Sequence, residues 1–152
     1  MMRFIKLFKR KAEKQSSYFG LNREKAFTKI FQENHWKSSE SLSGSGSEKS
    51  QTKEVVEIIN KVIKDYNIKS ILDIPCGDYN WIHDSHITNI EYIGADIVPD
   101  IIEANMSKFS DTNLEFRHLD LTTSTLPAVD LVFSRDCLVH LSNKDIFLAL
   151  KN

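Results

Sequence analysis

Carboxylates stand at the end of every predicted β-strand of this chain. The apolar run SILD ends on Asp73, two later runs end on Asp96 and Asp120, and a fourth runs into Arg135 and Asp136. The carboxyl ends of parallel strands meet at one edge of a sheet, which is where α/β proteins bind ligands. A single acid in such a position could equally be a turn residue or a helix cap. Four of them together predict a ligand site rich in negative charge.

The loop that follows Asp73 does not fit a dinucleotide. It reads IPCGDYN and contains one glycine, Gly77. A dinucleotide requires backbone N–H groups and a helix N-terminus at its pyrophosphate, and carboxylates would repel that group. Pro75 and Tyr79 also stand where the G-x-G-x-x-G fingerprint requires small residues. A ligand with hydroxyls, an amino group and a sulfonium would instead benefit from the acids. S-adenosyl-L-methionine is such a ligand, and we expect it as the cofactor.

Few other side chains near this edge are suited to catalysis or metal binding. His140 is the only histidine near it and could act as a base, but it could equally pack at the start of a helix. His83 and His86 lack the further ligands that a metal site requires, so we expect no metal. Cys76 is predicted to be a small packing residue, because nothing nearby would activate its thiol.

Helix and strand patterns alternate from Lys53 onward, which is typical of a parallel α/β sheet. Apolar residues at helical spacing predict an amphipathic helix first, and Pro99 suits the first turn of a later helix. Ser142 and Asp145 resemble a capping box that begins the last helix. The expected strands cover 68–74, 90–97, 113–119 and 128–134, and the expected helices cover 53–66, 98–109 and 142–152. We therefore predict the α/β class, a Rossmann-like parallel sheet with flanking helices.

The N-terminal part has a different composition. Residues 1–37 look helical, and residues 38–52 are rich in serine and glycine. By composition alone the second stretch is a flexible linker, but Trp36 just before it is unusual for a tether. Residues 1–14 are basic and could rest on an anionic membrane or form a solvated leader helix. The predicted division is an N-terminal helical extension with its Ser/Gly-rich segment, 1–52, and a cofactor-binding core, 53–152.

The overall composition is that of a globular protein. The chain has 152 residues, 41% of them hydrophobic and 27% charged, which suits one domain with its own core. Its net charge of −1 gives no reason to expect nucleic acid as a partner. No apolar run approaches the ~20 residues that cross a bilayer. The two cysteines form no CxxC pair, which favours the reducing cytoplasm over a disulfide-stabilised secreted protein.

The strand-end motifs resemble those of the class I S-adenosylmethionine-dependent methyltransferases. ILDIPCGDYNW is similar to their first motif, and YIGADIVPDIIEAN, FRHLDLT and VDLVFSRDCLVHLS follow in the order of the family. The resemblance extends from about residue 30 to the end of the chain, and it is closest to a bacterial group that acts on small molecules. It implies an enzyme that transfers a methyl group to an oxygen, nitrogen or carbon atom of a small molecule.

The resemblance also implies roles for single residues in binding the cofactor. Asp73 and Gly77 would hold its methionine portion, Asp96 its ribose hydroxyls, and Asp120 the exocyclic amine of its adenine. The Ser/Gly segment would fold over the cofactor, with His35 and Trp36 helping to wall the site. The full set of expected cofactor-binding residues is Trp36, Asp73, Pro75, Cys76, Gly77, Asp78, Asp96, Ile97, Asp120, Leu121 and Arg135. Asp136 and His140 are the expected catalytic residues, beside the methyl acceptor.

The fold of the family has seven strands, whereas four are predicted here. The chain ends inside the helix after the fourth strand, so we expect a truncated enzyme whose activity could be lost. The strand at 128–134 would then be an exposed apolar edge that another chain could cover in an oligomer. Two other classes stay open: a non-catalytic module that binds S-adenosylmethionine or a protein partner, and a nicotinamide-dependent oxidoreductase.

Overall fold

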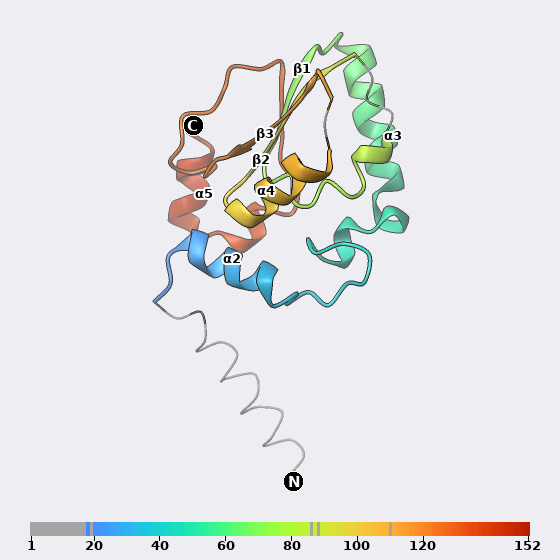
Figure 1. The fold of residues 1–152 in the computed structure, drawn as a ribbon. Coiled ribbons are helices and arrows are strands. Elements are labelled where there is room, and N and C mark those ends of the chain that lie inside the picture. Colours follow the sequence, from blue (N-terminus) through green and yellow to red (C-terminus); the bar gives the residue numbers. More distant parts are fainter. Residues whose placement is uncertain (1–17, 19, 86, 88, 110) are drawn as a thin grey trace.

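A four-stranded parallel sheet forms the centre of the molecule (Figure 1). The computed structural model describes residues 18, 20–85, 87, 89–109 and 111–152. The strands are β1, Ser70–Asp73, β2, Glu91–Asp96, β3, Leu114–His118, and β4, Leu131–Phe133. Their order across the sheet is β3-β2-β1-β4, and all three pairings are parallel. The predicted fold class is therefore confirmed, and each observed strand lies inside its expected range.

The strand order changes direction at β1, which places a switch point there. The chain runs outward from β1 to β2 and β3 and then returns to add β4 on the other side of β1. Connections on opposite sides of the sheet leave a crevice at the carboxyl ends of such strands. Among the described strands β4 pairs with β1 alone, and Val132 is 51% exposed.

Two helices cover one face of the sheet. Ile71, Tyr92 and Phe116 point to this face and pack against α3, Lys49–Asp65, and α4, Pro99–Lys108. The opposite face, with Leu72 and Ala95 fully buried, packs against apolar residues of the segment that connects β3 to β4. Alternation of side chains along each strand separates these two clusters, as expected for a sheet with both faces covered.

Local signals set the ends of the helices. Pro99 occupies the first turn of α4, and the Ser142 hydroxyl accepts a hydrogen bond from the Asp145 amide at the start of α5, Asn143–Ala149. Both features were predicted and are confirmed. The α3 helix begins at Lys49, four residues before the expected start. Its first turn, residues 49–52, is the end of the stretch 38–52 that is rich in serine and glycine.

The N-terminal helix α2, Arg23–Gln32, lies beside α5 at the carboxyl edge of the sheet (Figure 1). Asn22 caps it by accepting a hydrogen bond from the Lys25 amide at 2.9 Å. The basic stretch 1–14, expected to form a leader or membrane-binding helix, lies outside the described residues. No helix in the described part of the chain has both the length and the apolar character of a membrane span.

Candidate functional site

One cavity at the carboxyl edge of the sheet collects nearly all the residues predicted to form the site. Its walls come from the loops after the four strands, from α2 and from the Ser/Gly segment. The predicted residues that line it are Trp36, Asp73, Pro75, Cys76, Gly77, Asp96, Ile97, Asp120, Leu121, Arg135, Asp136 and His140. Asp78 alone of the predicted set is not among the lining residues. The switch point of the sheet thus brings together side chains that are more than a hundred residues apart in the chain, such as Trp36 and His140.

Asp73, the last residue of β1, is buried and 2% exposed. The Tyr92 hydroxyl donates a hydrogen bond to its Oδ2. Burial raises the pKa of the Asp73 carboxyl to about 7, the hydrogen bond from Tyr92 opposes that rise, and the charge of Asp96 adds to it. A cationic group entering the cavity would therefore favour the ionised form of Asp73.

Asp96, the last residue of β2, holds the loop after β1 in place. Its Oδ2 accepts a hydrogen bond from the Gly77 amide at 3.2 Å, and its Oδ1 accepts one from the Val98 amide at 3.0 Å. Burial raises the pKa of this carboxyl to about 6, and the backbone hydrogen bonds oppose the rise. The carboxylate is thus fixed in orientation at the edge of the cavity.

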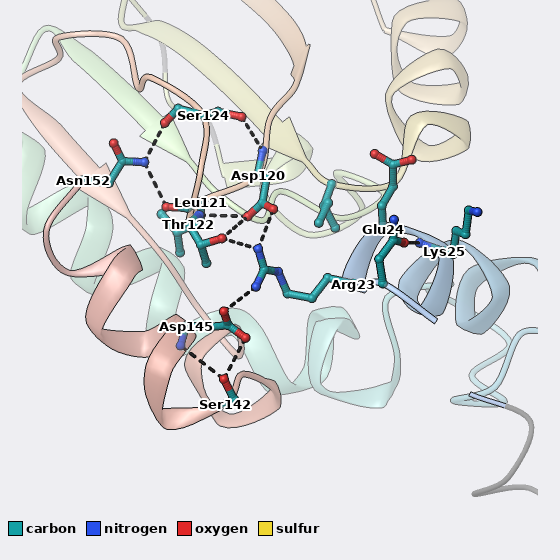
Figure 2. Close-up of polar contacts among 12 residues, drawn as sticks. Arg23, Glu24, Lys25, Asp120, Leu121, Thr122, Ser124, Ser142, Asp145 and Asn152 are labelled. Carbon is teal, nitrogen blue, oxygen red and sulfur yellow. Dashed lines mark hydrogen bonds and ion pairs between the residues drawn. The ribbon is translucent and has the colours of Figure 1, made fainter. Parts of the chain in front are cut away.

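Asp120, in the loop after β3, is bound by Arg23 of α2 (Figure 2). Its Oδ2 lies 2.8 Å from Arg23 Nη2, and its Oδ1 accepts hydrogen bonds from the Thr122 amide and hydroxyl, each at 2.8 Å. Burial alone would raise the pKa of Asp120, but the hydrogen bonds from Arg23 and Thr122 together lower it. Asp120 therefore carries its charge while part of its surface still faces the cavity.

The same guanidinium reaches α5. Arg23 Nη1 lies 2.6 Å from Asp145 Oδ1, and Asp145 is also bound by Ser142 of its own helix cap (Figure 2). Arg23 Nε is buried without a hydrogen-bond partner among the described residues. Arg23 thus joins three elements across the opening of the cavity.

Asp78 binds the Ser/Gly segment. Its carboxylate accepts hydrogen bonds from the Ser41 hydroxyl at 3.0 Å and the Leu42 amide at 2.8 Å, and from the Ser43 hydroxyl at 3.2 Å. The Asp78 amide in turn donates to the Ser43 hydroxyl at 3.0 Å. Ser41 is only 1% exposed, so the segment is ordered and folded against the loop after β1. The interpretation as a flexible linker is therefore wrong. Composition alone suggested flexibility, but hydrogen bonds to Asp78 hold the segment in one conformation.

Gly77 makes a close approach to this segment. Its φ is +56°, and an added Cβ would lie 3.0 Å from Ser43 Cβ and well inside van der Waals contact with Ser43 Oγ. Only glycine fits such a position without strain. The close neighbour of Gly77 is therefore Ser43, and Gly77 also lines the cavity, where it is expected to hold the methionine portion of the cofactor.

Aromatic side chains form the outer wall of the cavity. The His140 ring lies 5.5 Å from the Trp36 ring and 6.4 Å from the Phe27 ring, between centroids. His140 is exposed and Trp36 is 39% exposed. Both interpretations of His140 therefore have a basis, since it packs on aromatic rings and also borders the cavity.

A cation borders the cavity beside β4. Arg135 Nη2 donates a hydrogen bond to the Gly46 carbonyl at 2.6 Å and lies 3.2 Å from Asp136 Oδ2. Its guanidinium carbon lies 5.6 Å from the centroid of the Trp81 ring. Arg135 thus connects the end of β4 to the Ser/Gly segment.

Sequence reasoning missed the contribution of α2. Arg23, Phe27, Ile30 and Phe31 all line the cavity. The sequence predicted that residues 1–37 are helical, but no signal in it paired this helix with the carboxyl edge of the sheet. Thr122 was missed for a similar reason, since a threonine in a turn has many ordinary roles.

The donor set fits the expected cofactor. Three buried or half-buried carboxylates offer acceptors for amino and hydroxyl groups, and Ile97, Leu121 and Ile101 offer apolar surface for an adenine ring.

Within the described residues no three His, Cys, Asp or Glu side chains gather as a metal-binding group. His86, one of the two histidines considered for a metal, lies outside the described residues. Cys76 packs against Ile102 and Phe116, and burial raises the pKa of its thiol well above the ordinary value.

The fold is similar to that of solved methyltransferases. Magnesium protoporphyrin IX methyltransferase from Synechocystis PCC 6803, with bound S-adenosylmethionine, superposes with a TM-score of 0.62 at 14% identity, over 87% of this chain and 70% of that one. The methyltransferase domain of a bacterial Hen1 gives a TM-score of 0.56 at 16% identity, over 66% of this chain and 58% of that domain.

A third similar structure is an amino pentose methyltransferase from Micromonospora echinaspora. It gives a TM-score of 0.52 at 17% identity, over 67% of this chain and 43% of that one. The chain thus spans between 43% and 70% of the length of these three structures. No protein-family model matches the chain, and no curated protein matches it in sequence. These comparisons establish the class I methyltransferase fold for the part of the chain that they cover.

Proposed function

We propose that this chain binds S-adenosyl-L-methionine and takes part in transferring its methyl group to a small molecule. The observation that carries the proposal is the meeting of Asp73, Asp96 and Asp120 in one cavity, at the carboxyl ends of three neighbouring strands. Carboxylates accept hydrogen bonds from hydroxyl and amino groups and attract cations, whereas they repel a pyrophosphate. The fold shared with methyltransferases supports the same choice of ligand.

Each acid has a distinct part in the proposed binding mode. Asp73 pairs with the amino group of the methionine portion, Asp96 accepts the ribose hydroxyls, and Asp120 accepts the amine of the adenine. Ile97 and Leu121 pack against the adenine ring. Pro75, Cys76 and Gly77 shape the loop beneath the cofactor, and Asp78 acts indirectly, by holding the Ser/Gly segment against this loop.

The methyl acceptor is proposed to bind at the outer wall, near Trp36 and His140. When bound, the cofactor supplies an electrophilic methyl group on a sulfonium. The chain contributes orientation and the exclusion of water, which together can lower a barrier by ~7–11 kcal/mol. His140 or Asp136 would accept a proton from a hydroxyl or amine acceptor, and Arg135 would face the methionine end.

The two cysteines are free, which is consistent with the proposed cytoplasmic location.

Calorimetric titration with S-adenosylhomocysteine and with NAD tests the choice of ligand. We expect S-adenosylhomocysteine to bind and NAD not to bind. Asp96→Asn should weaken binding by about tenfold, because a neutral amide is a poorer acceptor for two hydroxyls. Asp65→Asn is the matched control, since Asp65 pairs with Lys61 on the exposed face of α3, away from the cavity lining. If NAD binds and S-adenosylhomocysteine does not, the result would favour an oxidoreductase instead.

A second measurement separates an enzyme from a binding module. The chain is incubated with S-adenosylmethionine labelled in its methyl group and with a panel of small hydroxylated and aminated molecules. Transfer of the label supports the proposed reaction. Tight binding of the cofactor without transfer to any acceptor would support the non-catalytic module instead.

A further inference from the structure

Tyr92 lies behind Asp73, on the side away from the cavity. Its hydroxyl donates a hydrogen bond to Asp73 Oδ2, and the two side chains are 5% and 2% exposed. Asp73 lines the cavity, whereas Tyr92 is not among the lining residues. No described residue donates a hydrogen bond to Asp73 Oδ1. Tyr92 therefore holds one carboxylate oxygen from the protein side and leaves the other for a ligand.

A glycine in β2 makes this contact possible. In the register of the sheet Asp73 pairs with Gly94, and Tyr92 pairs with Ile71, so Tyr92 reaches Asp73 along a diagonal. A Cβ at Gly94 would lie 3.2 Å from Tyr92 Cε1 and 2.8 Å from the Phe116 ring. Because Gly94 has no side chain, the Tyr92 ring can lie over it and reach Asp73. The tyrosine, the glycine and the aspartate form one arrangement across two strands.

The charges around Asp73 make its ionisation sensitive to this hydrogen bond. The groups that act on it are Tyr92 and Asp96 from β2 and Arg135 from the loop after β4. Asp96 opposes ionisation and Arg135 favours it. Burial and, to a lesser extent, the charge of Asp73 raise the pKa of Tyr79 and Cys76 in the loop after β1, so both stay neutral beside it. Burial and the charge of Asp73 raise the pKa of Tyr92 well above its ordinary value, so Tyr92 stays a donor.

We propose that Tyr92 is a positioning residue, whose hydroxyl stabilises the charged form of the Asp73 carboxylate and directs it at the cationic amino-acid end of the cofactor. This inference rests on the proposed function for the identity of the ligand. Without the hydroxyl, Asp73 would lose the one group among the described residues that stabilises its charge by direct contact. It would then take up a proton at a higher pH and attract the amino group of the ligand less strongly.

The test combines Tyr92→Phe with binding of S-adenosylhomocysteine between pH 6 and pH 8.5. At pH 7 we expect Kd to rise by about tenfold, because the variant loses a hydrogen bond to a charged group. Toward pH 8.5 the two affinities should converge, since Asp73 then ionises in both proteins. Tyr66→Phe is the matched control, because Tyr66 is 75% exposed at the end of α3. An equal loss of affinity at every pH would mean a purely structural role and would overturn the proposal.

A measurement without ligand separates this inference from the proposed function. Carbon-13 NMR follows the titration of the Asp73 carboxyl, assigned with Asp73→Asn, in the wild type and in Tyr92→Phe. A higher midpoint in the variant supports the role of Tyr92, and an unchanged midpoint overturns it. If the midpoint rises but S-adenosylhomocysteine binds to neither protein, the proposed function is wrong, and the assignment of the ligand to Asp73 is wrong with it.

Discussion

Arg23 and Asp120 are 97 positions apart in the chain and 2.8 Å apart in the structure. Their ion pair joins the N-terminal helix α2 to the loop after β3, and the second nitrogen of the same guanidinium binds Asp145 of α5 (Figure 2). The side chains are 27% and 22% exposed in the first pair, so solvent only partly screens their attraction. One arginine therefore holds the helix that covers the cavity.

Replacing Arg23 by glutamine should loosen α2. The variant loses both ion pairs and leaves two carboxylates near each other, so we expect a loss of ~1–3 kcal/mol in the free energy of unfolding and a Tm lower by several degrees. Hydrogen exchange followed by mass spectrometry should show faster exchange of the α2 amides. Lys25→Gln is the control, because Lys25 lies on the same helix and is exposed. Unchanged exchange in α2 would mean that its apolar contacts suffice to hold it.

The strand-end acids were predictable, because a buried parallel strand ends visibly in the sequence. SILD and EYIGAD read as apolar runs that end on an aspartate, and the rules of parallel sheets place those ends at one edge. The partner of Arg23 was not predictable, since an ion pair between distant segments depends on how α2 docks. The fold of the Ser/Gly segment was hidden for the same reason, because its order comes from Asp78, 35 to 37 residues further along the chain.

The unliganded protein should lose stability as the pH rises from about 4 to about 7. The pKa of Asp73 is raised to about 7 and that of Asp96 to about 6, chiefly by burial, from an ordinary value of 3.8. In this range the folded protein binds more protons than the unfolded chain, so the free energy of unfolding decreases with pH. Urea denaturation at several pH values measures this change in the free energy of unfolding. Asp73→Asn should flatten the profile between pH 4 and pH 7.

The acids with a lowered pKa affect the stability of the protein in a separate, more acidic pH range. Asp120 and Asp145 have a pKa below the ordinary value of 3.8, so the stability that they contribute is present above it and is lost as the pH falls further. The profile should therefore show a maximum near pH 4 to 5. A stability that rises steadily from pH 4 to pH 7 would contradict the assignment of raised pKa values to Asp73 and Asp96.

Asp78→Ala should release the Ser/Gly segment while the sheet stays folded. The substitution removes the acceptor of three hydrogen bonds, from Ser41, Leu42 and Ser43. Limited proteolysis should then cut the chain near residues 38–47, where the wild type resists. Asp65→Ala is the control, since it removes an exposed carboxylate from α3. Equal resistance of both variants would show that Ser38 and Glu48, joined at 2.9 Å, are enough to hold the segment.

The contact between Gly77 and Ser43 can be tested by a double-mutant cycle. Gly77→Ala places a methyl group against the Ser43 hydroxyl and keeps a φ of +56° that disfavours alanine. We expect a loss of ~1–3 kcal/mol in the free energy of unfolding from the strain of these two effects. Ser43→Gly removes the side chain in the way, so the double variant should recover the part due to the collision. Losses that simply add would mean that the backbone conformation of Gly77, and not its approach to Ser43, requires a glycine.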